Sequence, residues 1–101
     1  MIKHIVMFKL KSTENGKSAM ENAREAQERA EKLKDLIPTL EEMKVVCNSQ
    51  EADQGNYELA LICDFKDMEG LNAYQVHPEH LKFGEFISQI RESRACIDYE
   101  Y

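Results

Sequence analysis

Two segments of the chain place apolar side chains at every second position, and this period of two limits the fold more than any other feature. A period of two puts alternate side chains on opposite faces of a β-strand. In each segment one face is strongly apolar, while the other mixes apolar and polar residues. The strongly apolar sets are Ile2, His4, Val6, Phe8 and Leu10, and Tyr57, Leu59, Leu61, Cys63 and Phe65. Both segments are therefore predicted to be strands, and His4 is expected within an apolar row.

A helix is predicted after the first strand. Residues 12–17 form a polar loop containing Asn15-Gly16, and the residues from Ser18 to Glu21 have the form of a capping box. An apolar stripe then steps by three or four residues until Pro38 ends the helix. The stripe consists of Ala19, Ala23, Ala26, Ala30, Leu33 and Ile37. The small side chains at its start either bring the helix close to the sheet or leave space for a ligand, and the sequence allows both.

A proline divides the second helical region. Asp67 is predicted to begin a short helix that runs through Tyr74. A new helix should start at Pro78 with His77 as its cap, because proline suits the first helical position and disfavours helical geometry in the residue before it. One side of this helix is apolar, with Leu81, Phe83, Phe86, Ile87 and Ile90.

Two further strands complete the pattern. Residues 40–47, which precede a polar loop over residues 48–56, and residues 94–101 are predicted strands. In the last strand Ala95, Ile97, Tyr99 and Tyr101 oppose Cys96, Asp98 and Glu100. The order β-α-β-β-α-β is the ferredoxin-like arrangement of the α+β class. With 101 residues, of which 43% are hydrophobic, the chain is expected to form one domain over residues 1–101.

The predicted sheet has helices on one side only, which leaves its second face uncovered. That face is too apolar for open water, since it includes Ile5, Met7, Val46, Ala60 and Ile62. Covering it with a second copy of the chain is the simplest remedy. We therefore predict a homodimer.

Charge and hydropathy exclude several partners. The formal net charge is -6 and the chain has no long basic run, so neither nucleic acid nor an anionic membrane surface is expected as a partner. No apolar stretch approaches the roughly 18 residues of a membrane span. At the amino terminus, Lys3, His4 and Lys9 interrupt the apolar core that a signal peptide would need. A soluble, cytoplasmic protein is predicted.

Neither the cysteines nor the histidines have the spacing of a metal site. The three cysteines are Cys47, Cys63 and Cys96. Each lies in an apolar, strand-like segment, which is typical of reduced core thiols. Because His77 precedes Pro78 outside regular helix, it is not expected to converge with His80 and His4 on one ion. The sequence predicts no metal and no cofactor.

Candidate chemistry is concentrated in residues 74–84, which contain two of the three histidines and a tyrosine. His80 is expected in the first turn of a helix, where the partial positive charge favours the neutral imidazole that a general base requires. A capping or helix–sheet hydrogen bond is the alternative role for it. Tyr74 either holds a ligand oxygen or only packs its ring. His77 has a structural role available as a cap, and His4 has one as a hydrogen-bonded core group.

Four blocks of sequence point to a family. They are residues 3–11, Ile37-Pro38, residues 74–84, and Ile97-Asp98-Tyr99. Over nearly its whole length the chain resembles the stress-responsive A/B barrel domain family, whose members are dimeric α+β barrels. In a plant polyketide cyclase of that family, a tyrosine and a histidine at the positions matching Tyr74 and His80 transfer protons. A histidine matching His4 lines that site, and an aspartate matching Asp98 lies beside it.

The resemblance implies a cofactor-independent cyclase, isomerase or lyase that acts on a small, apolar, carbonyl-bearing molecule. Tyr74 would polarise the carbonyl oxygen and His80 would take a proton. His4 and Asp98 would shape the cavity, although Asp98 could also face solvent at a sheet edge. His77 is a further candidate for substrate binding. The competing hypothesis is a non-catalytic stress-response or ligand-binding barrel.

Overall fold

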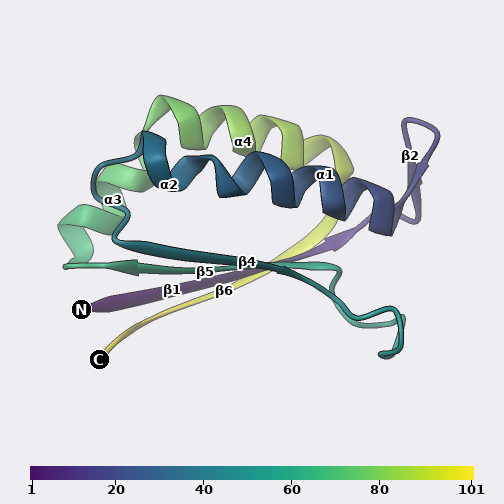
Figure 1. The fold of residues 1–101 in the computed structure, drawn as a ribbon, viewed down its shortest axis with the longest axis horizontal. Coiled ribbons are helices and arrows are strands. Elements are labelled where there is room, and N and C mark those ends of the chain that lie inside the picture. The colour runs from purple at the N-terminus through teal and green to yellow at the C-terminus, as the bar shows by residue number, and fades with distance from the viewer.

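One antiparallel sheet of four strands carries all the helices on a single face in the computed structural model, which describes residues 1–101 (Figure 1). The strands are β1 (Ile2–Leu10), β4 (Glu42–Cys47), β5 (Leu59–Phe65) and β6 (Arg91–Glu100), in the spatial order β4-β5-β1-β6. The helices are α1 (Ala19–Glu31), α2 (Leu33–Leu36), α3 (Met68–Val76) and α4 (Pro78–Ile90). This arrangement confirms the predicted ferredoxin-like fold of the α+β class.

The polar loop before α1 is a small hairpin of β2 (Thr13–Glu14) and β3 (Lys17–Ser18). Its tight turn uses Asn15 and Gly16, which have φ angles of 57° and 74°. Asparagine and glycine are the residues that adopt this left-handed geometry most readily. The predicted capping box is present, because the Ser18 side chain accepts from the Glu21 N–H and the Glu21 carboxylate accepts from the Ser18 N–H.

Small residues bring α1 close to the sheet. Ala23, Ala26 and Ala30 have no exposed surface, and they belong to a core of 20 buried hydrophobic residues between the helices and the sheet. Of the two roles left open for the alanines, the structure supports close packing. No helix in the structure is both long and apolar enough to cross a membrane.

The apolar side of α4 is narrower than predicted. Phe83, Ile87 and Ile90 are buried and Phe86 is partly buried, but Leu81 is 58% exposed. Leu81 lies about 140° around the helix from Phe86 and about 160° from Phe83 on the other side, so it points away from the sheet. Its assignment to the buried side was wrong.

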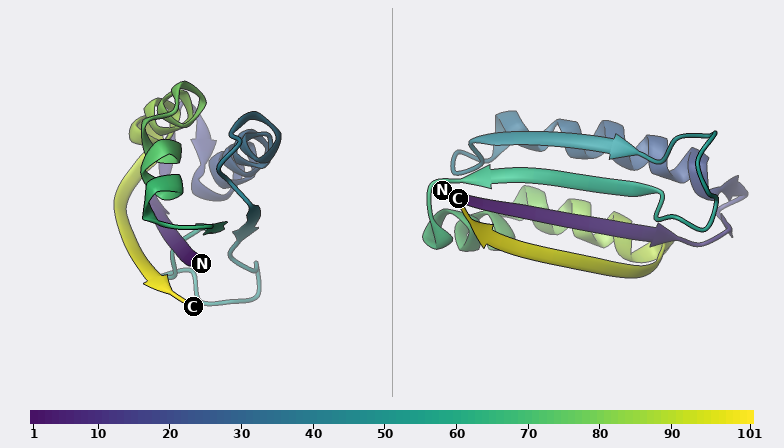
Figure 2. Two further views of the ribbon diagram at one scale, coloured as in Figure 1. Left: turned by 90° about the vertical axis from the view of Figure 1, so that its left-hand side faces the viewer. Right: turned by 90° about the horizontal axis from the view of Figure 1, so that it is seen from below.

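The second face of the sheet carries no helix, as the view from below shows (Figure 2). Several large apolar side chains on this outer face are exposed, namely Met7 at 40%, Ile97 at 59% and Tyr99 at 43%. Ile5 lies directly opposite Ile97 in the pairing of β1 with β6. The structure thus confirms the uncovered apolar face on which the dimer prediction depends.

Candidate functional site

The junction of α3 and α4 fixes where the candidate histidines lie. His77 is both the residue after α3 and the N-cap of α4, and its Nδ1 accepts from the Glu79 N–H at 3.1 Å. Pro78 follows at the first helical position, as predicted. The turn places Tyr74 at the end of α3 beside His80 in the first turn of α4, with ring centroids 4.4 Å apart.

Tyr74 lies between the two other candidate rings. Its ring centroid is 6.2 Å from that of His4 on β1 and 4.4 Å from that of His80. Only 1% of Tyr74 is exposed, and Phe65 packs against it with a centroid distance of 5.0 Å. His4, which is far from the other two residues in the sequence, therefore forms one aromatic row with Tyr74 and His80 across the helix–sheet interface.

Asp98 holds the imidazole of His4 from the neighbouring strand. The two residues are direct partners in the pairing of β1 with β6, and Asp98 Oδ1 lies 2.5 Å from His4 Nδ1. A carboxylate accepts hydrogen bonds, so Nδ1 donates and Nε2 is left as the acceptor nitrogen of a neutral His4 ring. His4 is buried, whereas 34% of the Asp98 side chain is exposed.

His80 has the same tautomer for a different reason. Its Nδ1 lies 3.1 Å from the Gln75 carbonyl oxygen, which can only accept, so Nδ1 donates and Nε2 is free to accept a proton. Burial lowers the pKa of His80, and the hydrogen bond to Gln75 opposes this change. The sequence analysis attributed the neutral ring to the partial positive charge at the helix end, whereas burial is the main cause of the lowered pKa.

Tyr74 remains a protonated phenol. Burial raises its pKa, and the neighbouring Cys63 thiol raises it further. Burial likewise raises the pKa of Cys63 to about 12, so the thiol stays protonated. Tyr74 is therefore suited to donate a hydrogen bond and unsuited to act as a base at neutral pH.

A cavity of about 140 Å³ separates the sheet from α4 at these residues. Cavities of about 150 Å³ in other proteins hold a molecule of the size of benzene. The lining residues are His4, Val6, Phe8, Leu61, Tyr74, His80, Phe83, Gly84, Ile87, Arg91 and Arg94. The cavity thus brings together His4, Tyr74 and His80, with Asp98 behind His4. His77 does not line it.

A larger hollow lies elsewhere on the molecule. It measures about 550 Å³ and is lined mostly by polar residues, among them Lys9 and Glu58. These two form an ion pair with each other at 2.7 Å, and no histidine or tyrosine lines the hollow. The smaller cavity is therefore the better candidate site, because it combines an apolar lining with groups that can transfer protons.

The sequence analysis did not assign three residues, Arg91, Arg94 and Cys96, to the surroundings of the cavity. Arg91 and Arg94 line it, and neither forms an ion pair. Cys96, predicted to be a core thiol, is exposed, with its Sγ 3.5 Å from His4 Nδ1. That prediction was wrong because β6 is an edge strand whose inner face is left partly open. The alternation within residues 94–101 is the signal that places Arg94 and Cys96 on the same face as Asp98.

The family model for the stress responsive A/B barrel domain matches residues 2–101. No curated protein sequence matches the chain. A solved structure described as a dimeric protein of unknown function with a ferredoxin-like fold, from Bacteroides fragilis, is 30% identical over 99% of this chain and 95% of that one, with a TM-score of 0.86. A dimeric ferredoxin-like protein of unknown function from Thermobifida fusca is 25% identical over 99% of this chain and 90% of that one, with a TM-score of 0.82.

Hydroxynitrile lyase from Passiflora edulis shares the fold at lower identity. It is 17% identical over 97% of this chain and 90% of that chain, with a TM-score of 0.77. At that identity the likeness concerns the fold alone.

Proposed function

This chain belongs to the stress responsive A/B barrel domain family, and on that premise we propose that it is an enzyme that moves a proton on a small carbonyl compound, as a cyclase, isomerase or lyase. The observation that carries the proposal is the cavity lined by a phenol donor, Tyr74, and a neutral imidazole acceptor, His80. Both groups are supplied by the chain itself, so the proposed chemistry needs no cofactor.

The first step would be enolisation. The Tyr74 hydroxyl donates a hydrogen bond to the substrate carbonyl oxygen, and His80 Nε2 takes a proton from the adjacent carbon. As the C–H bond breaks, its electron pair forms a carbon–carbon double bond, and the carbonyl oxygen becomes an enolate oxygen held by Tyr74. Because the two ring centroids are 4.4 Å apart, one small substrate can contact both groups. Ring closure, isomerisation or cleavage would then return the proton.

His4 and Asp98 would position the substrate. The Asp98 carboxylate fixes the imidazole of His4 and leaves its Nε2 as an acceptor. In the proposed site this nitrogen accepts a hydrogen bond from a substrate hydroxyl or from the enol. The apolar lining, which includes Val6 and Phe83, favours a substrate with little charge at its buried end.

The working assembly in this proposal is a homodimer. Three of the similar solved structures are described as dimeric. The exposed outer face, with Met7, Ile97 and Tyr99, offers the apolar surface that a two-fold contact would bury. Two sheets facing each other in this way would give the α+β barrel of the family.

A non-catalytic barrel is the second candidate. The observation that favours it is size, since the cavity of about 140 Å³ is smaller than most small-molecule sites, which occupy about 300–1,000 Å³. The Passiflora edulis hydroxynitrile lyase supports the enzyme proposal at the level of fold only.

Proton exchange tests the proposal without knowledge of the natural substrate. The full chain is incubated in D2O with a panel of small enolisable ketones, and loss of the α-proton signal is followed by NMR. We expect catalysed exchange for at least one ketone, and a loss of about 10²- to 10⁴-fold in the His80→Ala variant. Lys82→Ala is the matched control, because this residue lies on the same helix with its side chain 73% exposed. Exchange that survives in His80→Ala would refute His80 as the base, and no exchange with any ketone would favour the non-catalytic barrel.

A further inference from the structure

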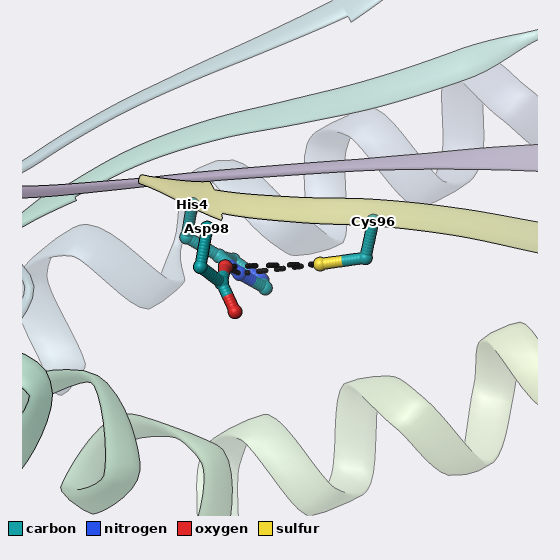
Figure 3. Close-up of side chains that lie close together, drawn as sticks. All are labelled: His4, Cys96 and Asp98. Carbon is teal, nitrogen blue, oxygen red and sulfur yellow. Dashed lines mark hydrogen bonds and ion pairs between the residues drawn. The ribbon is translucent and has the colours of Figure 1, made fainter. Parts of the chain in front are cut away.

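Three different metal-binding side chains converge at the edge of the sheet, next to the candidate cavity. His4 Nδ1, Cys96 Sγ and a carboxylate oxygen of Asp98 all lie within 4.8 Å of one another. Figure 3 shows Cys96 and Asp98 on β6 directed toward each other and toward the imidazole of His4. We propose that this cluster binds a divalent transition metal ion such as Zn²⁺, with water as a fourth ligand.

The strand pairing places the three groups on one face. His4 is the direct partner of Asp98, and Val6 is the direct partner of Cys96. Residues two apart in a strand point to the same side, so Cys96 and Asp98 flank the imidazole from β6. The sulfur lies 3.5 Å from His4 Nδ1 and 3.8 Å from Asp98 Oδ1.

These distances fit tetrahedral zinc. Zinc lies about 2.0 Å from nitrogen and oxygen ligands and about 2.3 Å from sulfur ligands. With tetrahedral angles, the sulfur should then be about 3.6 Å from each of the other two ligand atoms, and the nitrogen about 3.3 Å from the oxygen. The sulfur separations of 3.5 and 3.8 Å already meet this requirement. The Nδ1 to Oδ1 separation is 2.5 Å, the distance of a short hydrogen bond. Zinc would take the place of the Nδ1 proton, the Cys96 thiol would release its proton to solvent, and the partly exposed Asp98 side chain would move outward by about 0.8 Å.

The surroundings suit an ion that enters from solvent. His4 is buried and fixed on a central strand, whereas Cys96 and Asp98 are exposed on the edge strand β6. That exposure leaves room for a water ligand, as in zinc sites with three protein ligands. A nitrogen, a sulfur and an oxygen donor together favour Zn²⁺ or Co²⁺ over Mg²⁺ and Ca²⁺, which prefer oxygen ligands. The sequence interpretation treated cysteines and histidines as separate sets, whereas this site takes one of each.

Metal binding would change the hydrogen-bonding role of His4 Nε2, the nitrogen that faces the substrate in the proposed function. A neutral imidazole carries one proton, so ligation through Nδ1 moves that proton to Nε2. The Nε2 atom would then donate a hydrogen bond where it accepts one in the metal-free protein. Metal binding itself does not depend on the proposed enzyme activity. It does not depend on the proposed dimer either, because the outer face lies on the other side of the sheet from Cys96.

Cobalt spectroscopy tests the site directly. The metal-free full chain is titrated with Co²⁺, and absorption is followed for the thiolate-to-cobalt charge-transfer band and for the intense visible bands of tetrahedral Co²⁺. We expect saturation at one ion per chain, displacement by Zn²⁺, and no displacement by excess Mg²⁺. Absence of a thiolate band in the wild-type chain would overturn the proposal.

Variants identify the ligands. Cys96→Ser should abolish the charge-transfer band, and Asp98→Asn should weaken Co²⁺ binding on the order of tenfold or more. Cys47→Ser, which changes a thiol that is distant in the sheet order, should keep the band. Circular dichroism of each variant checks that the fold is intact. A band that persists in Cys96→Ser, or disappears in Cys47→Ser, would place the metal elsewhere and refute the assignment.

Discussion

His80 shows at the scale of a single residue how burial keeps an imidazole neutral. Removing water from the ring disfavours the charged imidazolium, and the positive charges of Arg94 and of any protonated His4 or His77 act in the same direction. The Gln75 carbonyl opposes them because it stabilises a protonated Nδ1. The net result is a pKa below the ordinary 6.5, so Nε2 can accept a proton at neutral pH.

The pH dependence of proton exchange follows from that direction. His80 can serve as the proposed base only when it is neutral, so the exchange rate should rise with pH through a midpoint below 6.5 and then level off. An NMR titration of the His80 ring protons should give the same midpoint. Protein stability should fall on acidification below 6.5, since the unfolded chain then binds more protons than the folded one. A His80 midpoint above 6.5 would contradict the burial argument.

At the scale of elements, the break between α3 and α4 is what sets the site. His77 caps α4 with its own Nδ1, and Pro78 supplies the fixed φ angle of the first helical residue. The geometry therefore assigns His77 to the helix boundary, whereas the sequence interpretation also named it as a candidate substrate-binding residue. The two roles predict different effects when His77 is substituted.

Replacing the cap should affect stability more than chemistry. His77→Ala removes the acceptor for the Glu79 N–H and should lower the free energy of unfolding by about 0.5–2 kcal/mol, as measured by urea denaturation. His77→Asn keeps a capping oxygen and should recover most of that loss. Both variants should retain proton exchange once folded. A large loss of proton exchange in His77→Asn, with normal stability, would indicate that His77 binds the substrate.

At the scale of the whole molecule, the two faces of the sheet have different roles. The inner face and the helices enclose the core and the candidate cavity, while the outer face is apolar and open. An exposed row that includes Ile97 at 59% and Tyr101 at 58% is a large apolar surface for a chain with 20 core residues. A dimer through this face would leave the cavity and the His4–Cys96–Asp98 cluster uncovered.

A charge on the outer face should separate the proposed dimer. Ile97→Glu would place a carboxylate in the middle of a buried contact, and light scattering coupled to size-exclusion chromatography should then report a monomer. Leu36→Glu is the control, since Leu36 is also an exposed apolar residue, at 48%, but belongs to α2. The control variant should keep the mass of a dimer. A monomeric wild-type chain, or an Ile97→Glu dimer, would exclude the outer face as the interface.

The sequence alone determined the order of the elements and the inner faces of β1, β5 and α1. Alternation assigned the buried rows of β1 and β5, the Ser18 capping box began α1, and His77-Pro78 divided the second helical region. Each of these features depends on interactions between residues close together in the chain, whose periodicity or local hydrogen bonding is visible in the sequence. The ferredoxin-like order follows from them because few topologies connect such elements.

Only the tertiary structure decided what the site contains. The register of β1 against β6 sets Asp98 beside His4 and brings the thiol of Cys96 to the same imidazole. The edge position of β6 exposes Cys96, and the direction of β6 carries Arg94 to the mouth of the cavity. A shift of one residue in this pairing would turn those side chains to the other face of the sheet. Register is set by packing between distant segments, so the local sequence of each strand does not fix it.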